Sequence, residues 1–522
     1  MTKRKATSFV ILISIIAFAS FYMKDDFQNL YDVLSNNDTA GSSSGPSRAY
    51  WKDISGLDED KITAYLAIRE TFEEGDFSAL EAHFKPLLKE LKNDTAVEGS
   101  INFAISALRS GAPQHQILLD NWIAQYPESA IAHLVRANYF SYVGGLYRGD
   151  DYYRELSDEQ KQNWHYYADK ANMDLSRSLE LDPSITITYA DRIYNSGGTG
   201  QEKFNLIAEA FDARPESYAI RAAALSMSRP RWGGSMTALE AIVEDTRRFV
   251  DQNASLKPLL GYVEYERASK LFKEKRYYEA KQAFAKALSH GNAGQYLSLR
   301  ALMLRYVDEA DKAFKDYMAI MDIAPVDANN YYWIGRHYYH KGEHDKAIKY
   351  LSLAAQLRPY DYDAQYFYGL ELENIKSHKE AANAYKSALY YTIEKGGKAW
   401  MRLGNLYSDS FHDAKKARYA YVMALQDDPE SPLIWFNYSF FLGDQKDCDI
   451  IGAAYIHSKV CEMDKNKKDS YCAAKYLDRD NGILTALSEE GTCPAIGDYI
   501  SAGRDPLKLE ETIDRRAFLT SQ

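Results

Sequence analysis

Apolar residues recur at helical spacing along most of the chain, in pairs of short runs separated by a polar turn. The segment from Ala328 to Pro359 shows this pattern, with apolar positions three and four residues apart, which predicts two amphipathic helices. Its small residues Gly335, Ala347 and Ala354 recur 34 residues later as Gly369, Ala381 and Ala388. A period of this length is typical of a helix–turn–helix solenoid.

Each small residue of the repeat has a physical role in this interpretation. Gly335 is expected where two helices cross closely, and Ala347 fills the matching site on the second helix. Leu351 extends the buried stripe of that helix. Gly342 lies in the turn, where a left-handed backbone suits glycine, and Pro359 follows the second helix and ends it.

The repeat resembles the tetratricopeptide repeat family, whose pattern places small and aromatic residues at fixed sites on two helices. All eight sites are filled here, by Tyr331, Ile334, Gly335, Tyr338, Ala347, Leu351, Ala354 and Pro359. Five consecutive units match over residues 261–430, although Ile393 replaces one proline and the last unit has an extra residue in its turn. The resemblance implies an all-α superhelical solenoid that binds a partner and uses no cofactor.

The rest of the chain divides around these repeats. We expect a signal peptide or membrane anchor at 1–23, a flexible linker at 24–60 and divergent helical hairpins at 61–260, followed by the five repeats at 261–430 and a degenerate repeat with a cysteine-containing cap at 431–522. In the divergent region, 61–92 reads as a hairpin that turns at Gly75, and Pro127, Pro183 and Pro215 each close a helix. Residues 142–165 read as an inserted loop before a helix near 163–181.

The N-terminal segment predicts export. Lys3, Arg4 and Lys5 precede the apolar run Phe9–Tyr22, which is shorter than the roughly 20 residues that a spanning helix needs. Small residues at Ala17 and Ala19 favour cleavage near Ala19, with an uncleaved anchor in the inner membrane as the alternative. Both predict a bacterial periplasmic location.

The cysteines are confined to the C-terminal part. An even number in an exported chain predicts two disulfides. A helix over 448–461 would hold its two cysteines roughly 20 Å apart, so we expect an antiparallel partner helix to supply the other two. The predicted pairs are Cys461–Cys472 and Cys448–Cys493, with four buried free thiols as the alternative.

The segment Arg229–Ser235, with sequence RPRWGGS, breaks the helical pattern. Pro230 and two glycines predict a fixed turn. The motif resembles one in a bacterial family of helical envelope proteins with no assigned activity. Two interpretations stay open: a binding loop formed by Arg229, Arg231 and Trp232, or a structural turn with Trp232 in the core.

The net charge and the known sequence motifs that are missing disfavour several classes of function. The net charge of −11, without a basic stripe, disfavours nucleic acid as a partner. The common nucleotide-binding, metalloprotease and hydrolase motifs are missing from the sequence. His337, His340 and His344 lie close in sequence, but the repeat template points them in different directions, so we expect no metal site.

Tyrosine is abundant, with 42 residues against 21 phenylalanines. The resemblance implies a concave groove lined by set positions of each first helix, and these positions are rich in tyrosine. Packing of these rings between repeats is the alternative. The expected groove residues are Tyr262, Tyr265, Arg305, Tyr306, Asn329, Tyr332, Arg336, Tyr339, Tyr366, Glu373 and Asn405. The carboxylate clamp of the family is only faintly matched, by Asn329, Arg336, Lys398 and Asn405.

Three functions follow from these patterns. The first is an exported scaffold that binds a peptide or protein in the tyrosine-rich groove. The second is a factor that binds glycans or assembles envelope polysaccharide with the same tyrosines. The third is an enzyme with a site in the divergent region 130–250, near the loops at 142–151 and 229–235.

Overall fold

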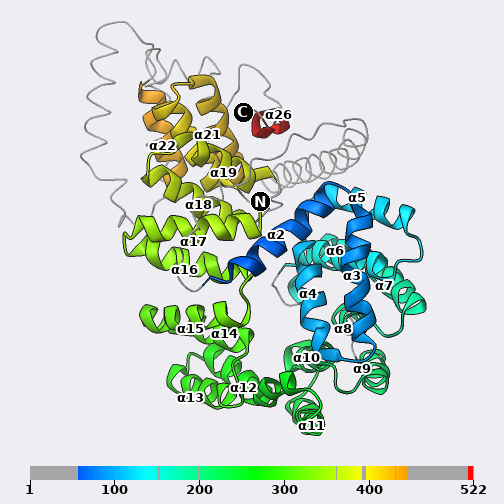
Figure 1. The fold of residues 1–522 in the computed structure, drawn as a ribbon. Helices are drawn as coiled ribbons and strands as arrows, with labels where there is room; N and C mark the ends of the chain where they lie inside the picture. Colours follow the sequence, from blue (N-terminus) through cyan, green and yellow to red (C-terminus); the bar gives the residue numbers. More distant parts are fainter. Residues whose placement is uncertain are drawn as a thin grey trace, which may run out of the picture. The chain divides into compact units, whose positions relative to one another are not determined.

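The computed structural model describes residues 57–149, 153–196, 200–359, 361–390, 396–429, 431–444 and 515–520. These residues form helices and turns, with no β-strand among them. Consecutive helices pack as hairpins that follow one another along the chain (Figure 1), which confirms the expected all-α solenoid. The predicted export segment 1–23, most of the linker 24–60 and the four cysteines lie outside the described residues. None of the described helices combines the length and apolar character that crossing a bilayer requires.

Five hairpins coincide with the predicted repeats. In each hairpin the two helices contact each other most, and the second helix then contacts the first helix of the next unit. The hairpins are α12 (Tyr262–Lys273) with α13 (Tyr277–Leu288), α14 (Gly294–Tyr306) with α15 (Ala310–Ile323), α16 (Ala328–His340) with α17 (His344–Leu357), α18 (Tyr362–Asn374) with α19 (His378–Tyr390), and α20 (Gly397–Asn405) with α21 (Ala414–Asp427).

The helix crossings explain the repeated glycine. A Cβ atom at Gly335 would lie 2.6 Å from Cγ of Leu351 on α17. At Gly369 it would lie 2.5 Å from the Tyr385 ring, and at Gly404 it would lie 2.8 Å from the Tyr421 ring. Real Cβ atoms do not approach that closely, so each glycine lets the two helices of its unit come into contact, as the sequence predicts.

The turn between the two helices requires a left-handed residue in each unit. Gly342 has φ +71° and supplies it without strain, as predicted. The equivalent turn positions in the other units carry side chains at φ between 53° and 62°, namely Lys275, Asp308, Lys376 and His412. The extra residue in the fifth unit is absorbed by a π turn over Leu406–Ser410 at the end of α20.

The region before the repeats also consists of helices. The predicted hairpin is α2 (Glu59–Glu73) and α3 (Phe77–Leu91), which turn at Gly75 with φ +74°. Pro127, Pro183 and Pro215 each follow a helix end, as expected. The remaining helices are α4 (Glu98–Ala107), α5 (Pro113–Gln125), α6 (Ala130–Arg148), α7 (Asp158–Leu181), α8 (Thr186–Asn195), α9 (Gln201–Ala213), α10 (Tyr218–Met227) and α11 (Met236–Arg247).

The predicted loop at 142–165 is wrong over most of its length. Helix α6 continues to Arg148, and α7 begins at Asp158 rather than near residue 163. Gly144 does not break α6 but lets α7 approach, since a Cβ atom there would lie 3.1 Å from Cβ of Tyr167. A glycine pair that reads as a loop in the sequence is therefore a close helix crossing.

Beyond the repeats, α22 (Pro432–Asp444) packs on α20 and α21 as the first helix of a further unit would. The short helix α26 (Arg515–Thr520) contacts α19. Phe518 of α26 inserts among aromatic rings of the fifth unit, with its ring centre 4.8 Å from that of Tyr419 and 5.6 Å from that of Trp400. The end of the last described hairpin is thus covered by apolar contacts from a later part of the chain.

Candidate functional site

Several of the expected groove tyrosines are buried between repeats. Tyr262, Tyr265 and Tyr332 are less than one-tenth exposed. Tyr265 stacks on Tyr296 of the next unit with ring centres 4.8 Å apart, and Tyr262 meets Tyr265 edge-on. These rings hold neighbouring units together, which is the packing role that the sequence left open.

At the fourth and fifth units, the polar groove residues have partners within the protein. Glu373 accepts a hydrogen bond from the Tyr385 hydroxyl and lies 3.6 Å from Nη1 of Arg402. Burial raises the pKa of the Glu373 carboxyl despite these partners. Asn405 accepts a hydrogen bond from the Tyr421 hydroxyl at 2.5 Å and donates one to Asn437 at 3.2 Å. These groups have little unsatisfied bonding capacity to offer a partner molecule.

The second and third units present a different arrangement, in which two arginines surround one tryptophan. Cζ of Arg305 on α14 lies 3.8 Å from the Trp333 ring centre. Cζ of Arg336 on α16 lies 5.0 Å from the same ring centre and 4.4 Å from that of Phe367 on α18. Distances of this size are typical of cation–π contacts. All four side chains are half-buried, so they form part of the accessible surface.

These two arginines have no carboxylate as an ion-pair partner in the described part of the chain. Among the described residues, neither Arg305 nor Arg336 has an acidic oxygen within ion-pair distance. Arg336 donates from Nη1 to the Tyr332 hydroxyl at 3.1 Å, while its buried Nε has no hydrogen-bond partner in the described part of the chain. Burial and the two arginine charges hold the pKa of His340 below its usual range. We call Arg305, Trp333, Arg336, Phe367 and His340 the arginine–tryptophan cluster.

Three of the other expected groove residues are accessible on the helices that carry this cluster. Tyr306 is 69% exposed and meets Phe272 edge-on, with ring centres 5.5 Å apart. Asn329 is exposed at the start of α16, and Tyr339 is half-buried against Phe367 at 5.9 Å. Tyr339 therefore contacts the cluster directly, whereas Tyr306 follows Arg305 on α14 and packs on α12.

Trp333 and Phe367 were absent from the expected groove. They occupy the same place in consecutive repeats, 34 residues apart, one position after the tyrosines that the family pattern singles out. The equivalent residues in the first and last units are Glu266 and Arg402. Comparing every position of the first helix between repeats, rather than the family's usual groove positions alone, would have found this aromatic pair.

The Arg229–Ser235 segment is a fixed turn that contains a short 3-10 helix over Pro230–Trp232. A Cβ atom at Gly234 would lie 1.9 Å from the carbonyl oxygen of Ser228, so only glycine fits there. Arg229 forms an ion pair with Glu266 at 2.5 Å, so its charge is balanced within the protein. The buried Lys203 ammonium donates to the carbonyl oxygen of Trp232 at 2.6 Å.

The two segments considered for an enzyme site do meet in space. The Arg148 guanidinium at the end of α6 lies 5.2 Å from the Trp232 ring centre and 5.6 Å from that of Trp164. Arg231 lies 4.8 Å from the Trp232 ring centre. Trp232 is therefore half-buried under two cations rather than enclosed in the core. The contact is a stack of cations and rings that holds the turn against α6 and α7.

The three histidines considered as metal ligands contact separate partners. His337 stacks on Phe314 with ring centres 4.5 Å apart, and His344 bonds to Glu371 through Nδ1 at 3.0 Å. His340 belongs to the arginine–tryptophan cluster. In the described ranges, no three His, Cys, Asp or Glu side chains converge as metal ligands would.

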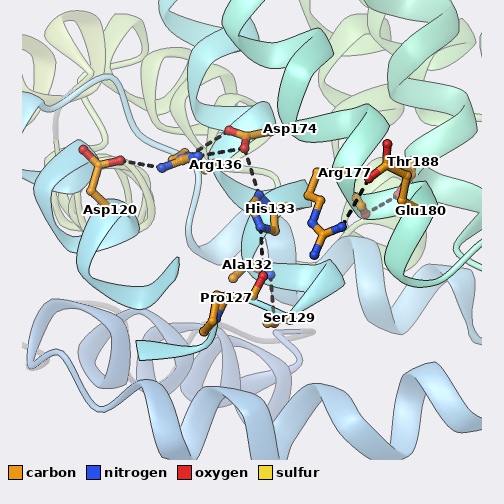
Figure 2. A network of polar contacts seen from close by, with 11 residues as sticks. Asp120, Pro127, Ser129, Ala132, His133, Arg136, Asp174, Arg177, Glu180 and Thr188 are labelled. Atoms are coloured by element: carbon orange, nitrogen blue, oxygen red, sulfur yellow. Dashed lines mark hydrogen bonds and ion pairs between the residues drawn. The ribbon is translucent and has the colours of Figure 1, made fainter. Parts of the chain in front are cut away.

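One buried polar network joins α5, α6 and α7 (Figure 2). Arg136 donates to both oxygens of Asp174 at 2.8 Å and to Asp120 at 2.8 Å. His133 bonds to Asp174 through Nδ1 at 2.9 Å, and its Nε2 faces the carbonyl oxygen of Pro127 at 3.4 Å. The carboxylate and both ring nitrogens are engaged within the protein, so the network fastens three helices and leaves no group directed at a substrate.

A cavity of about 620 Å³ lies beside α2, α4 and the start of α18. Two of the arginines that line it form hydrogen bonds within the protein. Arg69 is buried and donates to three helix-end carbonyls, those of Ala107, Gln356 and Leu357. Arg109 donates to Asn138 at 3.0 Å. The guanidinium groups of Arg69 and Arg109 are thus held by neutral acceptors within the protein.

Comparisons with known proteins give a consistent but distant picture. The chain matches no protein-family model and no curated protein. Among solved structures, it is similar to the APC/C hetero-tetramer Cut9–Hcn1, with 13% identity over 78% of this chain and 99% of that chain and a TM-score of 0.37. It is also similar to yeast Tom70, with 13% identity over 85% of this chain and 99% of that chain and a TM-score of 0.35.

A third similar structure is the C-terminal part of a TPR repeat-containing protein from Cytophaga hutchinsonii, with 15% identity over 48% of this chain and 96% of that chain and a TM-score of 0.33. Alignments at this level add little to what the chain's own repeats show. The 34-residue period, the glycine at the helix crossing of the third, fourth and fifth units and the left-handed residue in each turn are all present in the structure. The fold is therefore that of a tetratricopeptide-repeat solenoid.

Proposed function

We propose that this protein is an interaction scaffold that binds a segment of a partner protein across α14, α16 and α18. The observation that carries the proposal is the set of accessible side chains on α14 and α16, namely Arg305, Tyr306, Trp333, Arg336 and Tyr339. Tyrosine, tryptophan and arginine dominate binding hot spots because they bury large areas. Packed repeats hold these side chains in place, so little conformational entropy is lost on binding.

Photo-crosslinking in cells tests this surface directly. Benzoylphenylalanine replaces Tyr306 or Tyr339 on the proposed surface, and Tyr278 serves as the control. Tyr278 is 75% exposed but lies on α13, the second helix of its unit. Mass spectrometry then identifies the adduct and the crosslinked segment.

The proposal expects the same partner protein from Tyr306 and Tyr339, and little or none of it from Tyr278. A partner captured equally at all three positions would refute binding across the first helices. The same would follow if crosslinks formed only at Tyr278.

We also propose that the protein acts outside the cytoplasm. The basic residues before the apolar run Phe9–Tyr22 and the even number of cysteines support this location. N-terminal sequencing of the protein from periplasmic and inner-membrane fractions tests it, with cleavage near Ala19 or an intact anchor as the two compatible results. Recovery from the cytoplasm with an intact N-terminus and four free thiols would refute it.

A further inference from the structure

The arginine–tryptophan cluster carries positive charge that no carboxylate in the described part of the chain balances. Several other arginines of the repeats are paired: Nε of Arg300 lies 2.8 Å from Asp316, and Arg402 lies near Glu373. Arg305 and Arg336 differ, because no described carboxylate lies within ion-pair distance of either. Half-burying a cation without a counter-charge is unfavourable, so the site favours an anion that completes it.

The geometry indicates how an anion would be held. Both guanidinium groups lie over the Trp333 ring, and that of Arg336 also lies over the Phe367 ring. A guanidinium that stacks on rings keeps its N–H donors in its own plane, where a carboxylate can accept two of them side by side.

Building on the proposed function, we propose that the bound segment is acidic and places a carboxylate side chain against Arg305 and Arg336. The flanking rings of Tyr339 and Phe367 then contact apolar residues next to the acidic one. The arrangement is distinct from the family's carboxylate clamp, because Asn405 is already bonded to Tyr421 and Asn437. An extended polyanion fits less well, since the chain carries a net charge of −11.

Binding of two synthetic peptides to the full chain tests the proposal. One peptide places a single glutamate between leucine-rich flanks, and the other has glutamine in place of that glutamate. We expect the glutamate peptide to bind at least about tenfold more tightly, because hydrogen bonds to charged groups contribute about 1.5–3 kcal/mol. The double variant Arg305→Gln/Arg336→Gln should lose this preference.

A matched control removes the same charge elsewhere on the third unit. Lys341 and Lys346 are exposed and pair with Asp311 and Glu343, so Lys341→Gln/Lys346→Gln should retain the preference for glutamate. A second measurement needs no variant at all. Because the two arginines lower the pKa of His340, a bound carboxylate should raise that pKa, which NMR titration of the wild-type protein detects.

The outcomes separate this inference from the proposed function. If both peptides bind alike, or the glutamate peptide leaves the pKa of His340 unchanged, the acidic preference is wrong. Crosslinks from Tyr306 and Tyr339 to a segment without Asp or Glu would also overturn it, while the scaffold proposal would stand. If inorganic phosphate displaces the glutamate peptide at equal concentration, the cluster is a general anion site and the peptide assignment fails.

Discussion

The helix crossing at Gly335 allows a quantitative test of the repeat packing that positions the arginine–tryptophan cluster. Gly335 lies inside α16, between Trp333 and Arg336. The perturbation is Gly335→Ala, which adds one methyl group. That group would lie 2.6 Å from Cγ and 2.9 Å from Cδ2 of Leu351, and 3.1 Å from the backbone nitrogen of Leu351.

The magnitude follows from two opposing effects. Alanine favours the helix over glycine by roughly 1 kcal/mol. Overpacking of a close contact costs about 1–3 kcal/mol, and the backbone nitrogen cannot move aside as a side chain can. Gly145→Ala is the matched control, because Gly145 lies inside α6 with no atom within 4 Å of its Cβ position. The helix effect is similar at both sites, so Gly335→Ala should be less stable than Gly145→Ala by about 1–3 kcal/mol.

Hydrogen exchange is the suitable assay, since each repeat of a solenoid depends on its neighbours and unfolding need not be all-or-none. We expect faster exchange in α16 and α17 of Gly335→Ala, and unchanged or slower exchange in α6 of Gly145→Ala. The variant Leu351→Ala should remove most of the penalty of Gly335→Ala, since it deletes the atoms in closest contact. Equal protection of α16 in Gly335→Ala and the wild type would refute the close-crossing explanation.

Three further predictions concern stability. Asp174→Asn should lower the free energy of unfolding by about 3–5 kcal/mol at neutral pH. Burial opposes the charge of Asp174, but the hydrogen bonds from Arg136 and His133 outweigh it and lower the pKa of the carboxyl. Urea unfolding should therefore show the difference between variant and wild type shrinking as pH falls through that lowered pKa. Burial raises the pKa of Glu98, so the stability of the wild type relative to Glu98→Gln should be highest below about pH 4 and should fall as pH rises through the raised pKa; a flat difference would contradict this. Lys376→Gly should raise the free energy of unfolding by about 1 kcal/mol, because Lys376 has φ +62°, whereas Gly342→Ala should lower it by a similar amount in thermal melts.

The regular part of the fold was predictable in detail. The period located five hairpins, the turn at Gly342 and the reason for the glycine at the crossings of the last three. The prediction failed at Gly144, since a glycine in a close helix crossing and a glycine in a loop look alike without the partner helix. Tyr167 is that partner, and it comes from a helix whose start the sequence placed several residues too late.

The candidate site was only partly predictable. The repeat template selected Arg305, Arg336 and Tyr339, which are accessible, together with Tyr262 and Tyr265, which are buried. Side chains on one face of a helix look equivalent in sequence, but their exposure depends on the size and placement of rings in the next unit. Tyr296, for example, covers Tyr265.

The sequence by itself determined the repeat architecture, because each hairpin packs on its immediate neighbours and its contacts recur at a fixed spacing. Only the tertiary structure decided which polar groups remain available to a partner. Glu373 and Asn405 are satisfied by Arg402 and Asn437, each of which lies about 30 residues farther along the chain. Arg305 and Arg336 meet the Trp333 ring instead, and no carboxylate of the described residues lies within ion-pair distance of either. Glu373 and Arg402 come from consecutive units, as do Asn405 and Asn437, so these partners are brought together only when the units pack.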